Sequence, residues 1–275
     1  TPVSWKTNDG NVAGAAGLTM GTDGTIFVAV GDGSSSGAAA ASASPSYSNS
    51  VVSLEPKTLK LKESFTQPGA DFNSSPLVFR YKDKDLMAVS GNDGRLYLLD
   101  GTSLKTPLYV TLKYSNAGAP GGLATWESEG TRWILAPAVG SAQPGMKVAA
   151  NGPVTNGSVV AFKLVDAGGK LSLEPAWASR DLTSPATPLI FNGVAFVLST
   201  GEHRPANASA GSAQRAKASV PAVLYALDPM TGKELWSSGK TITSFARGGL
   251  SAAAGQVYLV TFDNTLYAFG IPMEH

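Results

Sequence analysis

The local order of this chain is clearest in the stretch Leu224-Tyr-Ala-Leu-Asp-Pro-Met-Thr-Gly-Lys-Glu-Leu-Trp236. A short apolar run leads into a polar turn, and a second short run ends in a tryptophan. Asp228 is suited to capping such a turn, and Gly232 can adopt the positive φ of a tight hairpin. The indole of Trp236 offers a large apolar plate for packing against a neighbouring unit. The stretch therefore predicts two antiparallel strands joined by a tight turn.

Similar units recur along the rest of the chain, and helical periodicity is almost absent. First strands, each after a small-residue segment, are expected at 17–20, 75–79, 122–126, 187–191 and 249–252. Second strands are expected at 25–30, 85–90, 132–137, 194–199 and 256–261. Third strands are expected at 50–54, 95–99, 158–162, 223–227 and 265–269. Outer strands, often with an aromatic residue, are expected at 61–65, 108–112, 175–177 and 234–236.

The repeat period of about 45 to 65 residues is typical of four-stranded propeller blades that carry insertions. We therefore predict an all-β fold, a β-propeller of four-stranded antiparallel blades, with about five blades in a single domain over 1–275. The approximate blades are 11–66, 67–114, 115–179, 180–239, and 240–275 together with 1–10. Each blade is an amphipathic sheet that cannot bury both faces alone, so successive blades should stack.

The stretch ending at Trp236 closely resembles the repeat of pyrroloquinoline-quinone-like (quinoprotein) β-propellers. That repeat has an apolar strand, Ala-Leu-Asp, a Thr-Gly turn and a strand ending in Trp. Degenerate copies are Ser53-Leu-Glu-Pro-Lys-Thr-Leu59 and Leu98-Leu-Asp-Gly-Thr-Ser-Leu104, and Thr265-Leu-Tyr-Ala-Phe-Gly270 is a further third strand. The chain is most similar to bacterial secreted members of this group. The resemblance implies a periplasmic or secreted location.

The segment Pro2-Val-Ser-Trp-Lys6 resembles an outer strand that carries its tryptophan but belongs to no blade. It could pair with the last blade, which stops after its third strand, and thereby close a five-bladed ring. Members of the family are usually longer, so the chain could instead be the C-terminal part of a larger propeller, completed by a second chain or an oligomer. We favour closure by the N-terminal strand, because an open arc would expose two apolar blade faces.

The composition excludes several classes of function. The formal net charge is +1, so nothing favours a nucleic-acid partner. The chain has no cysteine, which excludes disulfides, thiolate catalysis and thiolate metal sites. Its longest apolar runs have the length of strands, so no membrane-spanning segment is expected. Asp-Gly and Asn-Asp-Gly pairs only faintly resemble calcium loops, and we interpret them as hairpin turns, so no metal ligand is assigned.

Three connections between second and third strands are long, at 31–49, 140–157 and 201–222, whereas those at 92–94 and 263–264 are tight hairpins. In a four-stranded blade these connections lie on the same face as the links between blades. Binding sites commonly form on variable loops above a rigid scaffold, so this is the candidate functional face. The long loops could also be tolerated insertions. A short helix is expected within 208–218.

The candidate ligand-binding residues come from the third insertion and from the links, which should ring the mouth of a central channel. They are Asp71, Trp126, Glu127, Arg180, Asp181, Glu202, His203, Arg204, Arg215 and Arg247. Arginine with carboxylates and aromatic rings suits a polar ligand. The competing interpretations are that the histidine is a solvated loop residue and that most of the charged link residues tie blades together.

These observations favour a non-catalytic scaffold that binds a small molecule, a glycan or a protein outside the cytoplasm. The alternative is an alcohol or sugar dehydrogenase that uses pyrroloquinoline quinone and calcium, as the resemblance implies. The calcium ligands of such enzymes cannot be matched residue by residue, so the cofactor is unassigned, and no catalytic motif is present. Glycan processing would need paired carboxylates at a cleft, and the candidates are Asp71, Glu127, Asp181 and Glu202.

Overall fold

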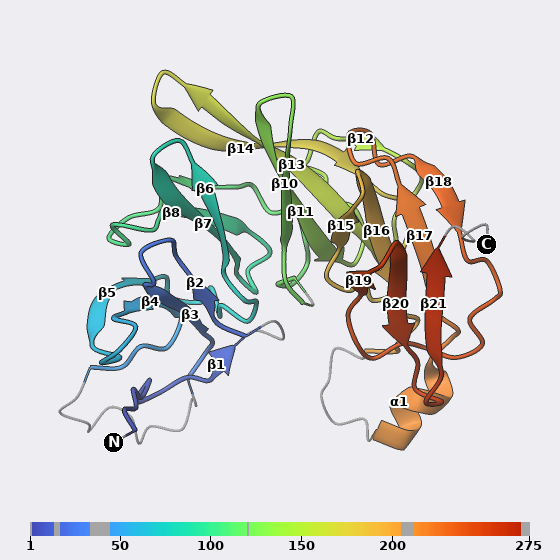
Figure 1. The fold of residues 1–275 in the computed structure, drawn as a ribbon, viewed down its shortest axis with the longest axis horizontal. Coiled ribbons are helices and arrows are strands. Elements are labelled where there is room, and N and C mark those ends of the chain that lie inside the picture. Colours follow the sequence, from blue (N-terminus) through green and yellow to red (C-terminus); the bar gives the residue numbers. More distant parts are fainter. Residues whose placement is uncertain (1, 14–16, 34–44, 120, 205–211, 271–275) are drawn as a thin grey trace.

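The computed structural model describes residues 2–13, 17–33, 45–119, 121–204 and 212–270. In this part of the chain, five sheets follow one another in a curved row, from the first sheet in blue to the last in red (Figure 1). Each sheet is built from strands that are consecutive in sequence. The all-β propeller prediction is confirmed.

The first sheet contains β1 (Val12–Ala13), β2 (Thr19–Met20), β3 (Ile26–Val30), β4 (Ser50–Leu54) and β5 (Leu61–Thr66). The second contains β6 (Leu77–Tyr81), β7 (Lys84–Ser90), β8 (Leu96–Asp100) and β9 (Tyr109–Val110). The third contains β10 (Ala124–Ser128), β11 (Thr131–Val139), β12 (Ala149–Ala150), β13 (Gly157–Ala167) and β14 (Lys170–Ala178). The fourth contains β15 (Leu189–Phe191), β16 (Val194–Ser199), β17 (Val223–Leu227) and β18 (Glu234–Ser237). The fifth contains β19 (Ser251–Ala253), β20 (Gln256–Val260) and β21 (Leu266–Gly270).

Hydrophobic clusters between successive sheets hold the row together. Side chains alternate between the two faces of a strand, so one face of each sheet can pack on the sheet before it and the other on the sheet after it. Phe27 and Val51 of the first sheet pack with Met87 and Leu99 of the second. The inner strands of neighbouring sheets also meet, β2 with β6, β6 with β10, and β10 with β15. The predicted stacking of amphipathic sheets therefore accounts for the core.

The turn predicted from the sequence motif has the expected geometry. The backbone N–H groups of Met230 and Thr231 each donate to Asp228 Oδ1 at 2.9 Å. Gly232 has a φ of 69°. The indole of Trp177, at the end of the third sheet, donates through Nε1 to the Pro229 carbonyl at 3.0 Å. The motif therefore forms both the hairpin of the fourth sheet and the surface on which the previous sheet places its tryptophan.

Two features of the third sheet go beyond the prediction. The β13–β14 hairpin is longer than expected. Its far end packs against the second sheet, where Leu171 and Leu173 share a hydrophobic cluster with Phe79 and Leu86. Lys82 Nζ and the Tyr81 hydroxyl both donate to Asp166 Oδ2, at 2.7 and 3.2 Å. The connection 140–157 contributes β12, which pairs with β14 in parallel.

The prediction that the N-terminal strand closes the last blade is wrong in this structure. Among the described residues, β21 pairs with β20 alone. Segment 2–10 lies beside the first sheet instead, where the Tyr47 backbone N–H donates to the Thr7 carbonyl at 3.1 Å. Trp5 packs against the outward-facing cluster of that sheet and lies 5.5 Å from the Tyr47 ring, centroid to centroid. This contact half-buries the tryptophan. Strands β1 and β21 lie at separate ends of the row (Figure 1).

The single helix of the described residues, α1 (Ser212–Ala218), falls within the stretch where a helix was expected. Residues 208–211 of that stretch lie outside the described residues, as do 34–44 and 205–211 of the long connections, and 1, 14–16, 120 and 271–275 of the predicted blades. Helix α1 is too short to cross a membrane, and the described residues contain no helix with the length and hydropathy to do so.

Candidate functional site

The links between sheets and the second-to-third connections lie on one face, as predicted. Asp71, in the link from the first to the second sheet, shows this directly. Its Oδ1 accepts the Asp32 backbone N–H at 2.7 Å, and its Oδ2 accepts the Asn92 side-chain amide at 3.1 Å. Asp32 and Asn92 belong to the second-to-third connections of the two sheets that the link joins. Asp71 therefore fastens neighbouring loops, which is a structural role.

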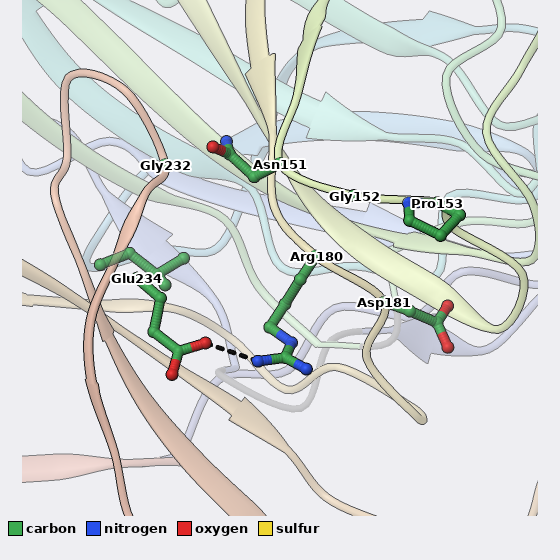
Figure 2. Close-up of a pocket in the computed structure, with 8 residues that line it drawn as sticks. Asn151, Gly152, Pro153, Arg180, Asp181, Gly232 and Glu234 are labelled. Atoms are coloured by element: carbon green, nitrogen blue, oxygen red, sulfur yellow. Dashed lines mark hydrogen bonds and ion pairs between the residues drawn. The ribbon is translucent and has the colours of Figure 1, made fainter.

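A cavity of about 430 Å³ opens on the seam between the third and fourth sheets (Figure 2). Three segments form it: the second-to-third connection of the third sheet, the link that follows, and the third-to-fourth turn of the fourth sheet. Its lining residues are Asn151, Gly152, Pro153, Arg180, Asp181, Leu227, Gly232 and Glu234. The structure thus brings two of the predicted site residues, Arg180 and Asp181, to one cavity.

Arg180 and Glu234 face each other across this cavity, and both remain partly exposed. Arg180 Nη1 lies 2.5 Å from Glu234 Oε2, and the exposed fractions of the two side chains are 47% and 36%. The hydrogen bond to Glu234 raises the pKa of Arg180, so the guanidinium stays charged. Its carbon lies 4.9 Å from the centre of the Tyr225 ring, a cation–π contact. The pair therefore places a fixed positive and a fixed negative group at the cavity wall.

Asp181 has a different role, although it adjoins Arg180 in sequence. Its carboxylate points away from the Arg180–Glu234 pair (Figure 2). Oδ1 accepts the backbone N–H groups of Thr155 and Asn156 at 2.8 and 2.7 Å, and Oδ2 accepts the Asn156 side-chain amide at 2.6 Å. Burial acts to raise the pKa of Asp181, but these amide hydrogen bonds outweigh it and lower the pKa. Asp181 therefore holds the connection before β13 as a carboxylate.

The rim of the cavity is held by Asn151. Its side-chain amide donates to the Ala178 carbonyl at 3.0 Å and to the Thr231 carbonyl at 2.9 Å. The two acceptors belong to the third sheet and to the turn of the fourth. Together with the Trp177 contact described above, these bonds fix the seam, so the cavity is preformed.

Glu202 gathers a second set of predicted residues around the start of the third insertion. Its buried carboxylate lies 2.8 Å from Arg204 Nε and 3.7 Å from Arg247 Nε. The Arg247 guanidinium is 5.2 Å from the Phe262 ring centre, and Phe262 stacks on Phe245 at 4.6 Å. These contacts join the link to the fifth sheet with that sheet's second-to-third turn, so this group also ties sheets together.

His203 and Arg215 lie near Glu202 in the chain, but their contacts belong to helix α1. The exposed His203 donates its backbone N–H to Ser219 Oγ at 2.8 Å, and that hydroxyl donates to the Arg215 carbonyl at 2.8 Å. Arg215 Nε is buried without a hydrogen-bond partner among the described residues. Neither side chain reaches the cavity lining.

Trp126 and Glu127 are not at the channel mouth, and that part of the prediction is wrong. Both lie on β10, close to the turn that leads to β11, at the opposite end of β11 from the insertion. Trp126 stacks on Trp133 with ring centres 5.3 Å apart, and Glu127 Oε2 is 2.7 Å from Arg132 Nη2. The strand runs further than its small-residue start suggested, and it carries both residues to the other face.

Asn151 and Glu234 were missed by the sequence reasoning. Glu234 stands in the fourth strand of the repeat, and its contact with Arg180 spans 54 residues of sequence, so no local pattern indicates it. Among the described residues, no group of three or more histidine or acidic side chains is placed to hold a metal ion. Asp71 and Asp181, the carboxylates of the links, are already bound by amides. The side chains that the structure describes therefore do not fit a site for calcium and a quinone.

Comparisons with known proteins agree on the fold alone. No family model and no curated protein matches the chain. The structure of quinohemoprotein alcohol dehydrogenase from Comamonas testosteroni is similar with a TM-score of 0.54 and 13% identity, over 89% of this chain and 43% of that one. The structure of BBS1N in complex with ARL6DN is similar with a TM-score of 0.53 and 11% identity, over 92% of this chain and 62% of that one. The chain therefore spans less than two thirds of either protein, and both likenesses support a β-propeller.

Proposed function

We propose that this chain is a non-catalytic propeller that binds a neutral saccharide in the cavity at the seam of the third and fourth sheets. The observation that carries the proposal is the partly exposed Arg180–Glu234 pair at the wall of a preformed cavity of about 430 Å³. This volume lies in the range of about 300 to 1,000 Å³ that is usual for small-ligand sites.

The charges of the cavity favour a neutral ligand over an anion. Arg180 contributes one positive charge, and Glu234 and Asp181 contribute two negative charges, of which Asp181 is bound by amides. Neighbouring hydroxyls of a sugar can accept from a guanidinium and donate to a carboxylate at the same time. Pro153 and Leu227 add apolar surface for the less polar face of the ring.

The same geometry supports binding rather than glycan hydrolysis. Glycosidases need one carboxyl with a raised pKa to act as the acid. The pKa of Asp181 is lowered, and Glu234 is held by an arginine. A quinone-dependent dehydrogenase is not supported either, because the described carboxylates do not form a calcium site. We also propose a periplasmic or secreted location, which rests on the sequence resemblance and is tested by cell fractionation.

The experiment is a titration of the chain with a panel of neutral mono- and oligosaccharides by calorimetry. Glu234→Gln keeps the shape of the side chain and removes its charge, so affinity should fall about tenfold. The matched control is Glu127→Gln, because Glu127 is also paired with an arginine but does not line the cavity. Absence of saccharide binding at millimolar concentration, or equal losses in both variants, would refute the proposal.

A further inference from the structure

The fifth sheet has an open edge within the described residues. The other four sheets each contain at least four strands, whereas the fifth contains β19, β20 and β21. A strand at the edge of a sheet presents unpaired N–H and C=O groups and can pair with an added strand. The position that a fourth strand would occupy is the outer edge of β21, at the end of the row (Figure 1).

The exposure of Trp236, in the fourth sheet, is a second sign that the fifth sheet can accept a fourth strand. Trp177 ends the third sheet and is 1% exposed, because it packs on the turn of the fourth sheet and donates to Pro229. Trp236 holds the matching place in the fourth sheet but is 44% exposed. Its ring lies 5.6 Å from Phe269 on β21, so it already leans toward the fifth sheet. A fourth strand and its turn would cover Trp236 as the fourth sheet covers Trp177.

The outward face of the fifth sheet carries two exposed apolar side chains at one end. Val260 and Leu266 pair across β20 and β21 and are 52% and 65% exposed. On the inward face of the same sheet, Val257 and Leu259 are buried against the fourth sheet. An added sheet that packed on this face would bury both side chains and gain their hydrophobic contribution. Within the described residues, each of the first four sheets is followed by another sheet, whereas the fifth is not.

The chain carries a segment suited to this edge. Residues 2–6, Pro-Val-Ser-Trp-Lys, resemble the fourth strands that carry Trp177 and Trp236 one residue before their ends. Residues 2–6 belong to no sheet of the structure. Trp5 packs on the outward cluster of the first sheet, which is how Trp177 packs on the fourth. Segment 2–6 thus already sits where the fourth strand of a preceding sheet would sit. Val3 of this segment and Met20 on β2 of the first sheet are 54% and 58% exposed.

We propose that the fifth sheet of one copy accepts residues 2–6 of a second copy as its fourth strand, with the first sheet of that copy stacked next to it. The contact joins two different surfaces, so it is head-to-tail, and it can close into a ring or extend. Strand addition supplies main-chain hydrogen bonds, and the apolar faces supply buried area. This assembly is independent of the saccharide site.

The test is the mass of the purified chain in solution, measured by sedimentation equilibrium over a wide concentration range. We expect masses that rise above the 28.2 kDa of one chain as concentration increases. Leu266→Lys places a charge in the contact, and Trp5→Ala removes the docking ring, so each should weaken association about tenfold or more. Leu266 is exposed in the single chain, so its replacement leaves the fold intact.

The matched control is Leu112→Lys. Leu112 is 60% exposed but follows the outer strand of the second sheet, far along the row from the proposed contact. A synthetic peptide of residues 2–7 should compete with the second copy and restore the mass of one chain. A chain that stays monomeric at all concentrations, or an equal effect of Leu112→Lys and Leu266→Lys, would overturn the proposal.

Discussion

Arg180 and Asp181 are neighbours in the chain, yet the seam between the third and fourth sheets gives them opposite tasks. Asp181 turns back to the connection before β13 and is saturated by amide donors. Arg180 reaches forward to Glu234 of the next sheet and remains open to solvent. A saturated carboxylate stabilises a loop but has little left to offer a ligand, whereas an exposed ion pair keeps free donors and acceptors. The ligand site that we propose therefore centres on Arg180 and Glu234.

The lowered pKa of Asp181 predicts a pH dependence of stability. Because the folded-state pKa lies below that of the unfolded chain, the stabilisation is fully present above the ordinary carboxyl pKa of about 3.9. It is lost as the pH falls from there through the folded-state pKa. Asp181→Asn keeps a hydrogen-bond acceptor but removes the charge. Between about pH 5 and 3, a range that brackets the carboxyl pKa, the free energy of unfolding should therefore fall less for this variant than for the unmodified chain.

Urea denaturation at several pH values measures this difference. Asp263→Asn is the control for a carboxylate whose pKa is also lowered, but mainly by one hydroxyl, that of Thr261. The assignment of Asp181 as a structural carboxylate fails if the pH profile of Asp181→Asn parallels that of the unmodified chain.

At the scale of elements, the turn between β17 and β18 joins two sheets as well as two strands. A Cβ at residue 232 would lie 2.3 Å from the Trp177 ring, on a backbone with a φ of 69°. The glycine is therefore needed twice, for its left-handed backbone and for the close approach of the indole. In this chain the Thr-Gly turn of the fourth sheet therefore forms the surface on which Trp177 of the third sheet packs.

Comparing Gly232→Ala with Gly168→Ala separates the cost of the left-handed backbone from the cost of the clash with the Trp177 indole. Gly168 has a φ of 66° in the β13–β14 turn, with no atom within 4 Å of its added Cβ. Gly168→Ala should cost about 1 kcal/mol of stability from the left-handed backbone alone. Gly232→Ala should cost about 2 to 4 kcal/mol, because the clash with the indole adds to the backbone strain. Chemical denaturation of both variants measures these changes. Equal losses of free energy of unfolding would mean that the Trp177 indole moves aside without destabilising the fold.

The strands and this turn could be predicted from the sequence because they depend on local patterns. The five expected second strands overlap β3, β7, β11, β16 and β20. The placement of segment 2–10 and the reach of the β13–β14 hairpin depend on contacts between distant segments, whereas Glu127 was misplaced because β10 runs further than its small-residue start suggested. Asp166, for example, is 84 residues from its partner Lys82. Of the ion pair at the cavity wall, only Arg180 could be predicted, because it is a charged residue in a link between sheets. Its partner Glu234 looks like an ordinary exposed strand residue in the sequence.

At the scale of the whole molecule, each sheet is stabilised by its neighbours in the row. The third sheet shares one cluster with the second and another with the fourth. The fifth sheet packs on the fourth alone among the described residues. Stability in such arrays is approximately a sum of unit terms and nearest-neighbour terms, so a terminal unit with one interface should open more easily than a central one.

Native-state hydrogen exchange measures this gradient directly. In dilute solution, amides of the fifth sheet, 251–270, should exchange faster than those of β11 and β13, because opening the fifth sheet breaks one interface and opening the third breaks two. A rise in protein concentration should slow exchange in the fifth sheet and in segment 2–6, because both take part in the proposed contact between copies. Exchange in β11, which lies outside that contact, should not change. Equal protection of the third and fifth sheets in dilute solution would mean that the row opens as one cooperative unit. In that case the last sheet would be stable without a neighbour, and its apolar outward face would serve a purpose other than assembly.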